Sequence, residues 1–182
     1  MAEKLLAGKS IAMIIAFREF RDEEYFIPKQ NLEIAGAKIT TVSSSLGTAI
    51  GKMGGDARVD LTLDNLEVNN YDAVLFIGGP GAVKYMDDSK AHQIAQGTLS
   101  NGKILGAICI APTILAKAGV LEGKRATVWF SNMDKSAVKI LKEEGAIYKE
   151  EPVVVDGKII TANGPQSARE FAQAVTGGLT EK

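Results

Sequence analysis

The sequence of 182 residues contains a single cysteine, Cys109, and a single histidine, His92. One cysteine cannot form an intrachain disulfide, and these two residues cannot supply the four ligands of a structural zinc site. A Ser-His-Asp triad would have to use His92, which polar neighbours within a predicted helix place on the surface. A lone cysteine without an export signal is typical of a reducing compartment, and we therefore expect a cytoplasmic protein.

An excess of positive charge and a long hydrophobic run are also missing. The 21 Lys and Arg residues are matched by 22 Asp and Glu residues, so the formal net charge is −1. Because no basic excess is available to neutralise a phosphate backbone, we expect no nucleic-acid partner. The early apolar run over residues 11–17 is far shorter than the ~20 residues of a membrane span, and no cleavage site follows it. We therefore predict neither a signal peptide nor a membrane partner.

The length and the order of the segments predict one domain over residues 1–182. Apolar runs predict strands over residues 10–16, 37–42, 72–77, 104–108 and 126–129. Helices are predicted over residues 22–35, 89–99, 111–118, 135–144 and 166–175, and hairpins over residues 47–63 and 153–161. This alternation predicts an α/β fold, a three-layer sandwich in which a parallel sheet carries helices on both faces. Ligands of such sheets bind at the carboxyl ends of the strands.

Cys109 lies directly after one of these strands and directly before a helix. So tight a turn from strand to helix holds its central residue in a sparsely allowed backbone conformation, as in nucleophile elbows. The turn also places the sulfur at a helix N-terminus, where the dipole favours a thiolate. The alternative is a buried structural cysteine. We predict a reactive thiol.

Two further groups come from neighbouring strand ends. Glu23 or Glu24, in the first turn of the first helix, could hold a buried protonated carboxyl that donates a hydrogen bond to the thiolate, and spacing does not choose between them. The backbone N–H groups of the glycine-rich segment 78–81 could stabilise an oxyanion together with the N–H of Ile110. The alternatives are a solvated acidic helix turn and a plain glycine turn.

Several segments resemble the ThiJ/PfpI superfamily, which includes the protein deglycases and the PfpI-type intracellular proteases. The resemblance runs from about residue 9 to residue 175. Its motifs are Ala107-Ile-Cys-Ile-Ala-Pro112, Glu24-Tyr-Phe-Ile-Pro28, Phe76-Ile-Gly-Gly-Pro80 and the tail Asp156-Gly-Lys-Ile-Ile-Thr-Ala-Asn-Gly-Pro165. Members of this family have a flavodoxin-like fold and form cytoplasmic homodimers or higher homo-oligomers. The resemblance implies the same fold, location and assembly for this chain.

The resemblance also implies roles for individual residues. It makes Cys109 the nucleophile and Glu24 the carboxylic acid bound to it, which settles the choice between the two glutamates. It implies that Gly79 and Ile110 supply the oxyanion N–H groups. The pocket residues implied in the same way are Gly78, Pro80, Trp129 and Asn163. No cofactor and no metal are expected.

The sequence departs from the family pattern at histidine. Protease-like members carry His directly after the cysteine, where this chain has Ile110, and deglycase-like members carry His about twenty residues later, where it has Trp129. Losing a positioned acid or base typically costs ~10²–10⁴-fold in rate. An unactivated amide is therefore a poorer substrate for this chain than an aldehyde or dicarbonyl.

Three hypotheses follow. The first is a cysteine-dependent hydrolase or lyase acting on small carbonyl compounds, glycated adducts or peptides, with Glu24 as proton relay. The second is a redox-sensing or stress-protective protein in which Cys109 is oxidised to a sulfinate without turnover. The third is a binding module that has lost its chemistry, supported only by Trp129. We favour the first.

Overall fold

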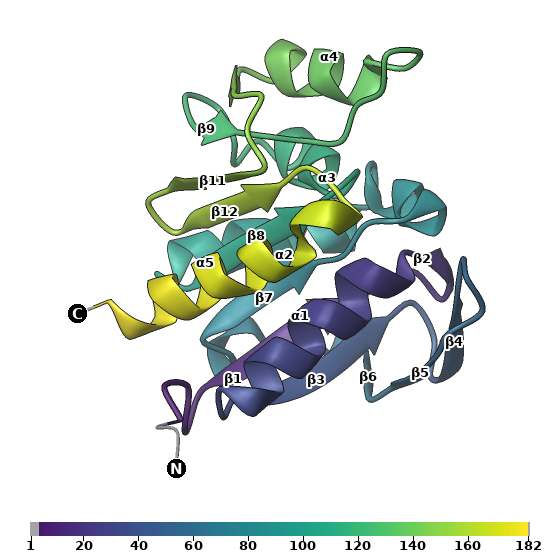
Figure 1. Cartoon of the computed structure of the whole chain (residues 1–182), viewed down its shortest axis with the longest axis vertical. Coiled ribbons are helices and arrows are strands. Elements are labelled where there is room, and N and C mark those ends of the chain that lie inside the picture. The colour runs from purple at the N-terminus through teal and green to yellow at the C-terminus, as the bar shows by residue number, and fades with distance from the viewer. Residues whose placement is uncertain (1–3, 182) are drawn as a thin grey trace.

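The structure, a computed structural model, describes residues 4–181. Its centre is a seven-stranded sheet of order β11-β12-β8-β7-β1-β3-β6 (Figure 1). The strands of this sheet are β1 (Ser10–Ile14), β3 (Lys38–Ser43), β6 (Leu61–Thr62), β7 (Ala73–Phe76), β8 (Ile104–Ile108), β11 (Val153–Asp156) and β12 (Ile159–Ala162). All neighbours are parallel except β11 and β12, which form the predicted hairpin.

Two small sheets flank the central one. One combines β2 (Arg18–Phe20), β4 (Gly47–Gly51) and β5 (Asp56–Val59), and the other pairs β9 (Arg125–Ala126) with β10 (Ile147–Tyr148). The antiparallel β4 and β5 are the predicted excursion over residues 47–63. Strand β2 has no counterpart among the predicted strands, because a three-residue strand is too short for a periodic pattern.

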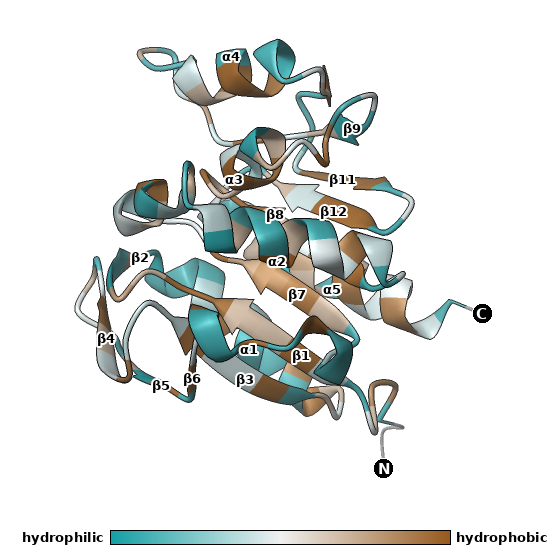
Figure 2. Cartoon of the chain, turned by 180° about the vertical axis from the view of Figure 1, so that it is seen from behind, coloured by the Kyte–Doolittle hydropathy of each residue, from teal (hydrophilic) through white to brown (hydrophobic). Residues whose placement is uncertain are grey.

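Helices cover both faces of the central sheet. They are α1 (Asp22–Ile34), α2 (Ser89–Ser100), α3 (Pro112–Lys117) and α5 (Ala168–Thr180). Helix α4 (Ser136–Glu143) instead packs against α3 and β10. Helices α1 and α5 lie together on one face in Figure 1, and α2 and α3 lie on the opposite face, which Figure 2 turns toward the reader. Each face has its own buried apolar cluster. The predicted three-layer α/β sandwich is therefore confirmed.

The observed helix bounds match the predicted ones to within about two residues, except at the end of α5. Helix α1 contains Pro28 in its second turn, as the predicted helix over residues 22–35 does. Helix α5 runs to Thr180, beyond the predicted end at residue 175, and includes Gly177 and Gly178. A Cβ at Gly178 would lie 3.0 Å from the side chain of Ile104. This glycine therefore lets the helix approach the sheet closely.

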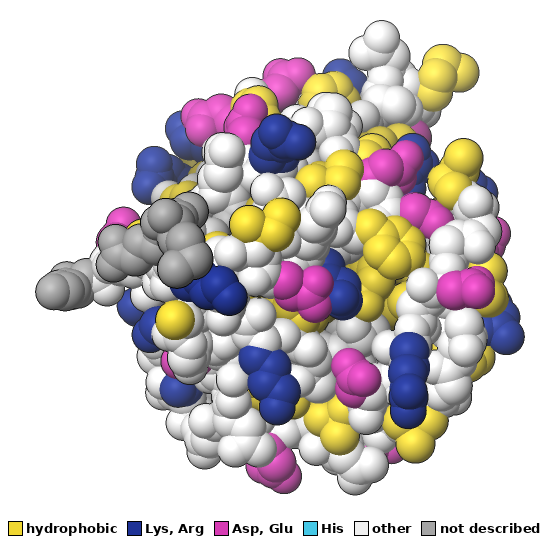
Figure 3. Space-filling model, turned by 60° about the horizontal axis from the view of Figure 1, so that its bottom comes forward, with side chains coloured by type: hydrophobic (Ala, Val, Ile, Leu, Met, Phe, Trp, Pro, Cys, Tyr) yellow, Lys and Arg dark blue, Asp and Glu magenta, His cyan; other side chains and the backbone are white. Residues whose placement is uncertain are grey.

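The surface mixes charges of both signs, as a net charge of −1 suggests. Figure 3 shows basic and acidic side chains interspersed over one end of the molecule, with apolar side chains scattered among them. In the part of the chain that the structure describes, no helix has the length and apolar character needed to cross a bilayer.

Candidate active site

Cys109 forms the predicted elbow. It follows the last residue of β8 and has a φ of 65°, a left-handed conformation that is rare outside glycine. Its N–H donates to the carbonyl of Ala162 at 2.9 Å, and its own carbonyl accepts the N–H of Trp129 at 2.9 Å. The surrounding backbone thus holds the strained conformation in place, as it does at other functional turns.

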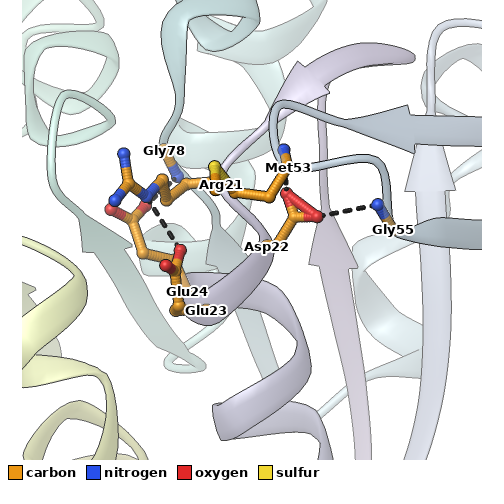
Figure 4. A network of polar contacts seen from close by, with 7 residues as sticks. All are labelled: Arg21, Asp22, Glu23, Glu24, Met53, Gly55 and Gly78. Carbon is orange, nitrogen blue, oxygen red and sulfur yellow. Dashed lines mark hydrogen bonds and ion pairs between the residues drawn. The ribbon is translucent and has the colours of Figure 1, made fainter.

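Glu24 lies in the first turn of α1 and is fully buried. Its Oε2 accepts the N–H of Gly78 at 3.0 Å, which ties the helix to the end of β7 (Figure 4). Glu23, by contrast, is half-exposed and accepts the Nε–H of Arg21 at 2.8 Å. Burial therefore separates the two glutamates that spacing alone could not distinguish, and it favours Glu24.

Gly78 separates the carboxyl from the elbow. A Cβ at this position would lie 2.5 Å from Oε2 of Glu24, 2.7 Å from Cβ of Cys109 and 2.7 Å from the carbonyl of Ile108. Any side chain at position 78 would push the acid and the cysteine apart. The absence of a side chain at this strand end is a packing requirement of the site.

The carboxyl of Glu24 and the thiol of Cys109 each change the pKa of the other. Burial raises the pKa of Glu24 to about 7. Burial, and then the charge of an ionised Glu24, raise the pKa of the Cys109 thiol, whereas the N–H of Ile110 and the guanidinium of Arg21 act in the opposite direction. Two groups coupled so closely titrate as a pair. The first proton leaves this pair near pH 7.

The predicted acidity of Cys109 therefore needs a correction. The expected source was the dipole of the following helix, but α3 has only 6 residues. Beside an ionised Glu24 the thiol is less acidic than an ordinary cysteine. A thiolate is favoured while Glu24 keeps its proton and donates it to the sulfur, so the carboxyl and not the helix controls the nucleophile.

The two predicted oxyanion donors both line the space beside Cys109. The N–H of Ile110 interacts with the sulfur. Within residues 4–181, the N–H of Gly79 has no hydrogen-bond acceptor. Gly79 has a φ of 114°, and a Cβ there would lie 2.4 Å from the backbone nitrogen of Arg21. This close approach brings the glycine turn against the segment that begins α1.

Cys109 opens into a pocket of about 310 Å³. The lining residues are Arg21, Lys52, Gly79, Pro80, Val83, Cys109, Ile110, Trp129 and Asp134. Pro80 and Trp129 were predicted there. Gly78 was also predicted to line the pocket, but it does not, and its N–H donates to Glu24 instead.

Asn163 was predicted to line the pocket, and the structure places it elsewhere. Its side-chain oxygen accepts hydrogen bonds from Ser167 at 2.8 Å and from Gln166 at 3.2 Å, and its N–H donates to Pro152 at 3.0 Å. These contacts order the turn before α5. The motif that contains Asn163 thus reflects a structural turn.

Sequence reasoning missed four lining residues: Arg21, Lys52, Val83 and Asp134. Lys52 and Asp134 come from surface segments far from the motifs, and local sequence patterns carry no signal for them. Arg21 adjoins the predicted helix start and could have been included as a neighbour of the acidic turn. Its guanidinium is the nearest cation acting on both Glu24 and Cys109.

His92 takes no part in this pocket. It lies in α2, and its Nε2 contacts the carbonyl of Met86 at 2.6 Å. The histidine position of deglycase-like proteins is filled by Trp129, which lines the pocket beside Cys109. Among residues 4–181, no group of three or more His, Cys, Asp or Glu side chains could hold a metal ion.

Fold and site together define a class: flavodoxin-like α/β proteins with a cysteine on a strand-to-helix elbow and a buried acid from the first helix. The model of the DJ-1/PfpI family matches residues 9–177. A crystal structure of a ThiJ/PfpI domain protein from Brachyspira murdochii superposes with a TM-score of 0.89 at 37% identity, covering 94% of this chain and 98% of that one.

Two curated relatives support the same family membership. Deglycase PH1704 of Pyrococcus horikoshii is 31% identical over 165 residues, covering 88% of this chain and 96% of the relative. Protein dj-1beta of Drosophila melanogaster is 31% identical over 174 residues, covering 94% and 90%. The chain belongs to the DJ-1/PfpI family, also called ThiJ/PfpI, and the predicted membership is confirmed.

Proposed function

We propose that the protein is a cysteine-dependent hydrolase or lyase that acts on small carbonyl compounds, glycated adducts or activated peptide derivatives. The observation that carries this proposal is that Cys109 and two backbone N–H donors line one pocket, while the fully buried Glu24 interacts with the Cys109 thiol. The deglycase among the relatives supports the same class of substrate. A pocket of about 310 Å³ lies at the small end of ligand sites, which favours compact substrates.

The reaction begins with addition of the Cys109 thiolate to a carbonyl carbon. A carbon–sulfur bond forms, and the π electrons of the carbonyl move to its oxygen, where the N–H groups of Gly79 and Ile110 stabilise the negative charge. Glu24 transfers its proton to that oxygen and becomes a carboxylate. This carboxylate is then the base that accepts a proton from the adduct or from an attacking water.

The carbonyl class is favoured over unactivated amides because the pocket holds no histidine to act as a second acid–base group near neutral pH. Amide hydrolysis needs an acid for the amine leaving group, and no histidine lines the pocket. The apolar wall formed by Val83 and Trp129 provides no such donor. One carboxyl group that both gives and takes a proton is enough for addition to an aldehyde.

Turnover of methylglyoxal, of a glycated amino acid and of a peptide ester tests this proposal. The expected result is activity on at least one of them that disappears in Cys109→Ser. A pure, folded protein that converts none of the three at high enzyme concentration would rule the proposal out.

A second candidate function is redox sensing, in which peroxide oxidises Cys109 to a sulfinate. One observation favours it: Oε1 of Glu24 is buried and has no hydrogen-bond partner within residues 4–181. An oxygen added to the neighbouring sulfur would give this atom a partner once the carboxyl is protonated. The expected result of mild peroxide treatment is a mass gain of about 32 Da that Cys109→Ser abolishes. An unchanged mass would refute the candidate.

Assembly into a homodimer or larger homo-oligomer and location in the cytoplasm stay predictions. Light scattering of the purified chain tests the first. Fractionation of cells that express it tests the second.

A further inference from the structure

Lys52 is the charged residue of the pocket whose side chain is not already engaged. The pocket wall carries three charged groups besides the cysteine pair: Arg21, Lys52 and Asp134. Arg21 donates its Nε–H to Glu23 at 2.8 Å. Asp134 accepts the N–H and the hydroxyl of Ser136 at 2.9 and 2.6 Å. Lys52 is exposed and forms no side-chain hydrogen bond or ion pair with any residue in 4–181.

The backbone around Lys52 is fastened to the start of α1. The N–H of Lys52 donates to the carbonyl of Phe20 at 2.8 Å. The carboxylate of Asp22 accepts the N–H of Met53 at 2.8 Å and that of Gly55 at 2.9 Å, as Figure 4 shows. The same helical turn carries Glu24. The turn between β4 and β5 is therefore held in register with the reactive pair, and the Lys52 side chain starts from a fixed point on the pocket wall.

A free cation at this point changes which substrates can approach. The reacting form of Cys109 is a thiolate, and it repels a substrate that carries a carboxylate. Arg21 acts on Cys109 and Glu24 and is partly neutralised by Glu23. The remaining walls are apolar apart from Asp134, an anion whose Oδ1 accepts two hydrogen bonds from Ser136. Lys52 is thus the group available to pair with an anionic substituent of the substrate.

We propose that Lys52 is a specificity-determining residue, which makes the pocket prefer small carbonyl substrates that carry a carboxylate. This proposal rests on the proposed function, because it concerns the substrate of the same pocket. Asp22 is a positioning residue in this account, since it acts on the substrate only through the turn that bears Lys52.

Alkylation of Cys109 by iodoacetate and by iodoacetamide tests the preference without requiring turnover. In both reactions the sulfur forms a bond to the CH₂ carbon, the carbon–iodine bond breaks, and iodide leaves with its electron pair. The two probes have nearly the same size and differ in carrying a carboxylate or a neutral amide. The readout is the iodoacetate-to-iodoacetamide rate ratio, divided by the same ratio for 2-mercaptoethanol.

The expected normalised ratio of the wild type is about two- to fivefold above 1 at low salt, the range of an exposed charge pair. It falls toward 1 in Lys52→Met, falls further in Lys52→Glu, and is retained in Lys52→Arg. Salt at about 0.5 M reduces the difference between the wild type and Lys52→Met, because it screens exposed charges.

Lys84 supplies the matched control. It is also an exposed lysine, but it lines a neighbouring cavity without Cys109. Lys84→Met is expected to keep the wild-type ratio. A ratio unaffected by Lys52→Met, or lowered equally by Lys84→Met, would overturn the proposal. Alkylation needs only an accessible thiol and no carbonyl turnover. Absence of turnover would therefore count against the proposed function, while the normalised alkylation ratio would still decide the role of Lys52.

Discussion

The pocket has two regions that are built in different ways. The floor consists of the lining residues Gly79, Cys109 and Ile110 together with the buried Glu24 and Gly78, which pack against Cys109 without lining the pocket. These residues lie at strand ends or in the first helical turn. The rim consists of Lys52, Val83, Trp129 and Asp134, which come from loops and short turns. The floor combines a fully buried acid with a strained cysteine, whereas Lys52, Val83 and Asp134 of the rim are exposed.

This difference indicates that the floor carries out the reaction and that the rim determines which substrate binds. The reacting groups of the floor are surrounded by backbone and have few alternative positions. Their chemistry therefore depends on fixed geometry. A rim side chain has water on one side and can be exchanged without disturbing the core. We therefore expect substitutions in the floor to abolish activity or folding stability, and substitutions in the rim to change which substrate is used.

The largest expected effect is that of Cys109→Ser. A serine hydroxyl beside Glu24 is not ionised near neutral pH, so the nucleophile is lost while the elbow stays intact. Activity on the best carbonyl substrate should fall by about 10³-fold or more. Steady-state kinetics measures the loss, and an unchanged thermal unfolding curve serves as its control. Residual activity within tenfold of the wild type would remove Cys109 from the mechanism.

The next effect is that of Gly78→Ala, which adds a methyl group between the acid and the cysteine. The clash with Glu24, Cys109 and the Ile108 carbonyl should lower the free energy of unfolding by at least about 1–3 kcal/mol. Activity should fall by about a hundredfold, because misplacement of about 1 Å costs that much. Urea denaturation and kinetics measure the two losses.

Gly97→Ala is the matched control for this substitution. Gly97 lies inside α2, and a Cβ there would meet Val68 at 3.6 Å, an ordinary contact. This control should gain about 0.5–1 kcal/mol of stability and keep its activity. If the two alanine variants behave alike, the floor is not as tightly packed as described.

The burial of Glu24 predicts a pH dependence of stability. Its pKa is about 7 in the folded protein and about 4.3 in an unfolded chain, so the protonated form is favoured by folding. The resulting stability is fully present below about pH 4 and is lost as pH rises through about 7. The loss amounts to about 4 kcal/mol.

Glu24→Gln removes this titration, so its free energy of unfolding should vary less between pH 4 and pH 8 and exceed that of the wild type at pH 8. Glu23→Gln, at the half-exposed neighbour, should retain the wild-type slope. Denaturant titrations at a series of pH values measure both. Parallel curves for the wild type and Glu24→Gln would show that the carboxyl is solvated.

The smallest effect concerns the rim. Trp129→His places an imidazole at the position where deglycase-like proteins carry histidine, beside Cys109. It should raise the rate on a peptide ester by about tenfold, a modest part of what a positioned acid–base contributes. Trp129→Phe, which adds no titratable group, should give no such gain. Equal rates in the two variants would mean that the rim does not limit the chemistry.

Most of the floor could be predicted from the sequence, because its residues are adjacent in the chain to the elements that position them. Examples are the cysteine between a buried strand and a helix and the glycines at the next strand end. The choice of Glu24 over Glu23 needed the family resemblance or the structure, because it depends on which side chain the sheet buries. Arg21 could have been predicted as a neighbour of that turn.

The rim could not be predicted in this way. Lys52 and Asp134 reach the pocket through tertiary contacts of surface turns, and Asn163 was assigned to the pocket on a motif that orders a turn instead. The predicted acidity of Cys109 relied on the dipole of the following helix, but α3 has only 6 residues. These differences arise because side-chain neighbours across the fold leave no local pattern in the chain.

The central claim is that Cys109 and Glu24 share a proton, and the pH profile of Cys109 alkylation by iodoacetamide tests it most directly. The account predicts that the wild type is alkylated more slowly than free cysteine once Glu24 ionises near pH 7, and that Glu24→Gln, which lacks the charge opposing ionisation of the sulfur, reacts faster than the wild type there. Identical curves for the two proteins, at the rate of free cysteine at every pH, would contradict it.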